Sequence, residues 1–279
     1  SAGGAAGGAA GGAAGGGWRV RGTAPFVTSW GLADVFLVAA VTDQEQPEIV
    51  WFLVSGQPTV AVRPSPPLAL AVLQATSTVT LHLEDLVVPD ADVVRVEPLD
   101  AWRARDRPAT ARPPAAALGV AERCCRLLSG VAAERGGAVE GAAVALAGEL
   151  VRCRTHAYAL ADARPGAQGD LPVDTAPPDE TGEPADGGAR GADPADGGAR
   201  GAEPADGGAL ADHLASMVEA RAWCLDLAQR SSLALVAAVG GRAMTRSHPA
   251  QRLAREAAFY AVQAQTGAIR AATLRRLAR

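Results

Sequence analysis

The hydrophobic period of the sequence changes near Pro113, and this change limits the possible folds more than any other feature. Before it, apolar residues form short runs such as Val35–Val41 and Ile49–Val54, which flank the polar turn DQEQPE. Short apolar runs around polar turns are typical of hairpin strands. After Pro113 the apolar residues recur every three or four positions, which is typical of helices. The sequence therefore predicts an α+β fold, a small antiparallel β-domain followed by a C-terminal four- to five-helix bundle.

The helical half divides into segments that the residue pattern can locate. Helices are expected at Leu118–Glu134, at about 139–161, at 210–239, and as a final pair within 248–277. In that final pair Pro249 suits a first helical turn, where a missing N–H is no loss, and Gly267 marks the break. Helices of this length that are joined antiparallel form a bundle.

Two stretches contain too little apolar side chain to pack. Residues 1–17 repeat the unit GGAA, and residues 164–208 repeat a ten-residue unit such as PADGGARGAD. We expect a disordered N-terminus and a disordered insert. The predicted domains are thus a Gly/Ala tail at 1–17, a partial β-domain at 18–100, and a helical domain at 101–279 that the insert 164–208 interrupts.

Composition argues against several classes of function. The formal charge is −4 with no basic run, so no nucleic acid is expected, and no apolar run reaches the length that a membrane span needs. The four cysteines lack metal-ligand spacing and are expected to be reduced and buried in a cytoplasmic protein. No histidine has a carboxylate or cysteine at ligand spacing, so we expect no metal site. The cysteines are Cys124, Cys125, Cys153 and Cys224.

Three blocks of the chain resemble the acyl-CoA dehydrogenase family. GGRAMTRSHPAQRLAREAAFYAVQAQT, at 240–266, is similar to the family's C-terminal signature of a diglycine, a proline, an R-L-x-R-D/E-A block and Y-E-G-T. FVTSWGLADVFLVAAVTD, at 26–43, resembles the family's W-I-T segment and its following strand. LHLEDLVVPDADVV, at 81–94, resembles a strand pair that precedes the helices. The blocks keep the family's order and separation, and the resemblance covers 18–163 and 210–279, only the last part of a full enzyme.

The resemblance implies a flavin cofactor, FAD, and assigns residues to it. It places Thr28 at the flavin N5 edge, with Phe26 beside the ring system and Val27 between them. It places Gly240 and Gly241 at the cofactor of a neighbouring subunit, which implies a homo- or hetero-oligomer, and Thr266 at the cofactor's phosphate side. From the residues alone, Phe26 also fits a core position and Thr28 an ordinary strand. The glycines fit a plain helix end, and Thr266 fits a helix cap.

The family's catalytic glutamate would fall at Ala264, which takes no proton. Some relatives carry the base on the first helix of the bundle, but residues 110–114 contain no acid. Asp106 and Glu122 are nearby and suit solvated positions. The Ala264 backbone N–H remains able to polarise a thioester carbonyl, so the sequence predicts a substrate contact here and no catalytic residue.

Three functions follow from the resemblance. The first is an acyl-CoA dehydrogenase-like oxidoreductase, impaired or incomplete in this chain, that removes a proton and a hydride from an acyl-CoA or related thioester. The second is a flavin-dependent monooxygenase on the same fold. The third is a non-catalytic partner subunit of a heteromeric flavoenzyme, and the loss of a carboxylate at Ala264 favours it.

Overall fold

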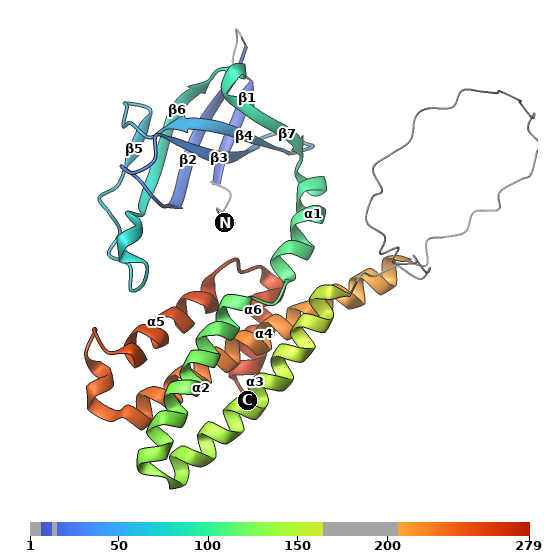
Figure 1. The fold of residues 1–279 in the computed structure, drawn as a ribbon. Helices are drawn as coiled ribbons and strands as arrows, with labels where there is room; N and C mark the ends of the chain where they lie inside the picture. The colour runs from blue at the N-terminus through green and yellow to red at the C-terminus, as the bar shows by residue number, and fades with distance from the viewer. Residues whose placement is uncertain (1–6, 13–15, 164–205) are drawn as a thin grey trace, which may run out of the picture.

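The computed structural model describes residues 7–12, 16–163 and 206–279. The strands form one domain, and the helices form a bundle that helix α1 connects to it (Figure 1). The predicted α+β order of strands before helices is confirmed. The expected insert lies outside the described residues except for 206–208, which begin helix α4 at Asp206 rather than near Leu210.

The sheet has seven strands in the order β5-β6-β2-β1-β3-β4-β7, and its pairs are antiparallel except β1 with β3. The strands are β1 (Gly7–Gly12), β2 (Trp18–Val27), β3 (Val35–Thr42), β4 (Glu48–Ser55), β5 (Val62–Pro64), β6 (Val79–Val88) and β7 (Val93–Pro98). Two short 3-10 turns, η1 (Gln74–Thr76) and η2 (Asp90–Asp92), lie between strands.

Alternation along the strands builds the core of the β-domain. In β4, Val50, Phe52 and Val54 point to one face and are buried, and they pack with Val20 and Leu81 from other strands. Successive strand residues point to opposite faces, so the VxFxV spacing places all three side chains inside.

Strand β1 lies within the segment 1–17 that the sequence predicts as a flexible Gly/Ala tail. The segment pairs with β2 from Gly7↔Thr23 to Gly12↔Trp18 and with β3 at Ala9↔Val41 and Ala10↔Thr42. Main-chain hydrogen bonds need no side chain, so a Gly/Ala segment forms a strand when two neighbouring strands offer it partners.

The helical part contains the expected helices and one more. They are α1 (Leu99–Ala111), α2 (Ala115–Arg135), α3 (Gly137–Asp162), α4 (Asp206–Val239), the 3-10 turn η3 (Gly240–Met244), α5 (Pro249–Val262) and α6 (Gly267–Leu277). The sequence does not predict α1, because Pro108 lies inside it and proline normally ends a helix. Pro249 does occupy the first turn of α5, as expected.

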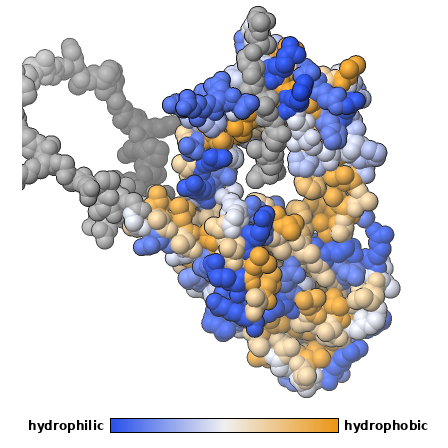
Figure 2. Space-filling model, turned by 180° about the vertical axis from the view of Figure 1, so that it is seen from behind, coloured by the Kyte–Doolittle hydropathy of each residue, from blue (hydrophilic) through white to orange (hydrophobic). Residues whose placement is uncertain are grey.

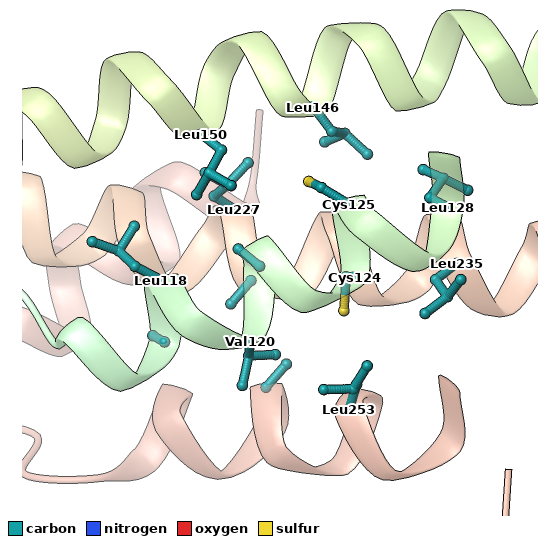
Figure 3. Close-up of a cluster of buried hydrophobic side chains, with 14 of the residues drawn as sticks. Leu118, Val120, Cys124, Cys125, Leu128, Leu146, Leu150, Leu227, Leu235 and Leu253 are labelled. Atoms are coloured by element: carbon teal, nitrogen blue, oxygen red, sulfur yellow. The ribbon is translucent and has the colours of Figure 1, made fainter. Parts of the chain in front are cut away.

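The bundle core gathers on helix α2 (Figure 3). Leu118 of α2 lies below Leu150 of α3, Leu128 of α2 lies close to Leu235 of α4, and Val120 points toward the helix α5 that carries Leu253. Alanine and cysteine fill most of the other buried positions, so the helices pack on small side chains with few aromatic ones. Each methylene at these close-packed positions therefore matters for stability.

The four cysteines are free and buried, as the sequence predicts. Burial raises the pKa of the Cys124 thiol to about 12 and also raises the pKa of Cys125. Cys153 and Cys224 join α3 to α4 with their sulfurs 3.7 Å apart. The hydrogen bond between Cys153 and Cys224, followed by burial, raises the pKa of Cys224.

Replacement of Leu235 by alanine tests the bundle core. Leu235 is 1% exposed, so Leu235→Ala should lower the free energy of unfolding by about 2–5 kcal/mol through lost burial and a cavity. The matched control is Leu233→Ala in the same helix, where the side chain is 61% exposed and the cost should stay within about 0.5 kcal/mol. Urea titrations followed by circular dichroism measure both changes, and equal losses would contradict the assigned packing.

Ellman's reagent tests the burial of the cysteines. Since the reagent must reach the sulfur and all four thiols are buried, none should react at pH 8 in the native protein. After denaturation four thiols should titrate. Rapid reaction of a native thiol would contradict this account.

Candidate functional site

A hollow separates the β-domain from the bundle (Figure 2). Helix α1 spans the gap on one side. At a second point Arg246 Nη2, which follows η3, donates to Gln74 Oε1 of η1 at 3.3 Å. The facing surfaces of the β-domain and the bundle are therefore the two walls of a cleft.

The link between β7 and α1 fixes the separation of these walls. Arg105 of α1 donates two hydrogen bonds of 2.7 Å to the two oxygens of Glu97 in β7. The hydrogen bonds from Arg105 lower the pKa of Glu97, and bidentate pairs of this kind fix geometry strongly. Trp102 of α1 also packs on Trp51 of β4, with ring centroids 6.4 Å apart. These contacts hold helix α1 in a fixed position on the sheet, and α1 leads directly into the bundle.

The bundle wall includes the loop between α5 and α6, which lies at the end of the bundle that faces the β-domain (Figure 1). Ala264 in this loop has a left-handed backbone, with φ of 49°. Thr266 caps α6, because its hydroxyl accepts a hydrogen bond from the Ile269 N–H at 3.3 Å. The structure therefore brings Ala264 and Thr266 together, and it confirms the capping role of Thr266.

A buried arginine holds this loop in place, and the sequence did not point to it. Arg221 of α4 is 5% exposed and donates to the carbonyls of Gln263 and Arg112 at 2.9 Å each. One guanidinium thus joins α4 to the α5–α6 loop and to the α1–α2 junction. The Nε of Arg221 is buried and has no hydrogen-bond partner among the described residues.

The bundle wall is electrostatically positive. Burial lowers the pKa of Arg221, because desolvation penalises its charge. No ion pair to Arg221 occurs within the described residues, and neither 110–114 nor 263–266 contains an acid. A guanidinium in a medium of low dielectric favours negative charge nearby. These two segments therefore offer a buried positive charge and no carboxylate, whereas Glu219, paired with Arg275, lines the groove that reaches Thr266.

The expected aromatic and hydroxyl groups lie at the end of strand β2. Strand β2 runs toward the bundle and ends at Val27 (Figure 1). Phe26 is 66% exposed, so it is not the core residue that one interpretation of the sequence allowed, and Thr28 is also exposed. The turn after Thr28 is fixed, because Ser29 N–H donates to the Thr76 carbonyl at 2.7 Å.

Gly240 and Gly241 lie away from the α5–α6 loop. They follow α4, and Gly240 has φ of 76°, the left-handed conformation of a glycine helix end. Helix α5, whose 14 residues span roughly 21 Å, separates them from Ala264 and Thr266. A Cβ at either glycine would meet no atom within 4 Å, so this surface is open.

A groove of about 950 Å³ lies between α1, α3, α4 and α6 and shares Thr266 with the loop. Its floor is apolar, with Leu160, Leu214 and Ile269, and Arg107 lies at its rim. Helices far apart in the chain supply these residues, so sequence pattern alone gave no signal for the groove.

Comparison with known proteins finds similar solved structures but no similar sequence family. The chain matches no protein-family model and no curated protein sequence. Its structure is similar to the acyl-CoA dehydrogenase of Geobacillus kaustophilus, with a TM-score of 0.64, 17% identity, and coverage of 98% of this chain and 64% of that chain. It is also similar to the electron transferring flavoprotein of Acidaminococcus fermentans, with a TM-score of 0.62, 18% identity, and coverage of 99% of this chain and 64% of that chain. A third similar structure is the dibenzothiophene monooxygenase of Paenibacillus sp. A11-2, with a TM-score of 0.62, 14% identity, and coverage of 97% of this chain and 66% of that chain.

These similarities show that the chain has the fold of acyl-CoA dehydrogenases and related flavoproteins. It spans 64% of the length of the first two. The described residues contain no helix that is both long and apolar enough to cross a bilayer.

Replacement of Arg221 tests its hold on the loop. Arg221→Met keeps the length of the side chain but leaves the Gln263 carbonyl without its donor, a loss of about 1–3 kcal/mol for a buried group. Amide hydrogen exchange at Gln263 and Ile269, whose N–H groups donate to the Phe259 carbonyl and the Thr266 hydroxyl, should therefore quicken about tenfold or more. The control Arg126→Met alters an exposed arginine of α2 and should leave both rates unchanged. Unchanged exchange in Arg221→Met would show that the loop is held by something else.

Proposed function

We propose that this chain provides two walls of a flavin site in a flavoprotein of the acyl-CoA dehydrogenase fold and does not itself abstract a substrate proton. The observation that carries the proposal is the Ala264 loop, which has no acid within 263–266 and is held by the buried guanidinium of Arg221. This conclusion favours a partner subunit of a flavoenzyme over a complete dehydrogenase.

The residues of the cleft fit a flavin. Phe26 offers an exposed ring on which a planar group can stack, and Thr28 offers an exposed hydroxyl beside it. When bound, FAD supplies the hydride-accepting chemistry of the site. In this proposal Phe26, Val27 and Thr28 hold its ring edge, and Thr266 lies toward its phosphates. Gly240 and Gly241 face the cofactor of a second subunit in an oligomer.

Removal of an α-proton needs a base within hydrogen-bond reach of the α-carbon. Ala264 provides none, and Arg221 behind the loop stabilises negative charge instead of accepting a proton. The Ala264 N–H remains suited to polarise the carbonyl of an acyl-CoA or related thioester. We therefore infer thioester binding at this loop without dehydrogenation by this chain.

The monooxygenase hypothesis also accommodates the missing base, because oxygen activation by a reduced flavin does not need one. It is supported by the similarity to a protein named as a monooxygenase, at 14% identity. In either case four free cysteines are consistent with a reducing compartment, and we infer a cytoplasmic location.

An anaerobic titration tests the proposed function. FAD is added to the full chain and its fluorescence is followed, after which butyryl-CoA is added and absorbance at 450 nm is recorded. We expect flavin binding with no bleaching by the thioester. Bleaching would demonstrate a base that this account denies, and absence of flavin binding at saturating FAD would overturn the proposal. Oxygen consumption with reduced nicotinamide and a flavin reductase would favour the monooxygenase.

The variant Thr28→Val tests the assigned flavin contact. Loss of one hydrogen bond of about 0.5–1.5 kcal/mol should weaken FAD binding by roughly two- to twelvefold. Thr155→Val changes an exposed threonine of α3 and serves as the control with unchanged affinity. Fluorescence titration measures both, and equal affinities in the two variants would remove Thr28 from the site.

A further inference from the structure

Strand β1 occupies a slot that two other strands define. It pairs with β2 over six residue pairs and with β3 over two, whereas β2 and β3 do not pair with each other in the described sheet. Without β1, each would present a row of unpaired N–H and C=O groups. Such edges are templates for the addition of another strand.

The present occupant of this slot has almost no side chain. The sequence of β1 is GGAAGG, which carries no group larger than a methyl. Its neighbours are larger, since Ala10 lies opposite the fully buried Val20 and Ala9 lies beside Val41. Cross-strand side-chain pairs stabilise a sheet, and glycine weakens a strand. The slot therefore offers side-chain contacts that its occupant does not use.

The register of β1 is also poorly specified. The hexapeptide GGAAGG occurs at 3–8, at 7–12 and at 11–16, so a slip by four residues presents the same residues to β2. Register is normally fixed by side chains that must face a core. A strand of glycine and alanine repeats has little of that information and is readily displaced.

We propose that the slot between β2 and β3 is a strand-acceptor site, which Gly7–Gly12 fills until an extended segment of a second polypeptide replaces it. The segment lies antiparallel to β2 and parallel to β3, as β1 does. It carries β-branched residues at alternate positions, one of which lies opposite Val20 and Thr42, and no proline. A second copy of this chain does not fit this role, because its own GGAAGG adds no side-chain contact.

This inference rests on the proposed function, in which another chain completes the flavin site. Strand donation would join that chain to the β-domain beside the β2 strand that ends at Phe26 and Thr28. The slot and the flavin wall are nevertheless separate features, and each can be tested without the other.

The test measures fluorescence anisotropy of a labelled octapeptide that alternates valine and threonine between terminal lysines. The matched control peptide has proline in place of one central valine. The full chain should bind the first peptide and not the second. Ala10→Pro removes a main-chain donor from β1 and should tighten binding by about fivefold or more. Gly7→Thr with Gly11→Thr strengthens β1 opposite Thr23 and Arg19 and should weaken binding to a similar degree.

Two results would overturn the proposal. One is absence of binding by both the wild-type chain and Ala10→Pro, and the other is the same affinity in all variants, which would place the peptide elsewhere. If Ala10→Pro fails to fold, the comparison of the wild type with the double threonine variant decides alone. FAD titration of the same samples distinguishes the flavin-site proposal from the strand-acceptor proposal. Retained flavin binding without peptide binding overturns only the strand-acceptor site.

Discussion

The arrangement of the cleft depends on a guanidinium buried without a carboxylate partner among the described residues. Arg221 contacts the carbonyl of Arg112, 109 positions away, and that of Gln263, 42 positions away, so three parts of the bundle meet at one side chain. Burying a charge is costly unless hydrogen bonds satisfy it. The two carbonyls provide such bonds, and the orientation of the loop that contains Ala264 is fixed in return.

With the Ala264 loop fixed by Arg221, the cleft has two walls of different chemistry, one from the β-domain and one from the bundle. The β-domain contributes an exposed aromatic ring and a hydroxyl at the end of β2, and the bundle contributes a positive loop without an acid. The clamp between Glu97 and Arg105 fixes α1 to the sheet and so sets the position of one wall relative to the other. In our proposal such a cleft suits the binding of a planar, anionic group better than it suits proton abstraction.

The sequence predicted the features that depend on local pattern. The change of period near Pro113 separated strands from helices, Pro249 marked the start of α5, and the helical patterns around the cysteines suggested their burial. It missed α1, whose internal Pro108 normally signals a helix end, and β1, whose pairing depends on open strand edges rather than on its own side chains. The role of Arg221 depends on contacts across most of the helical domain, which no local pattern records. Phe26, Thr28, Gly240 and Gly241 were named through resemblance, and their roles stay predictions.

The most direct test of the account is hydrogen–deuterium exchange of the full chain with and without saturating FAD. If the cleft holds the flavin, the segments 26–30 and 263–266 should gain protection together, although they come from different domains and are far apart in the sequence. Protection confined to one of these segments, or to surfaces outside the cleft, would contradict the claim that the β-domain and the bundle form a single flavin site.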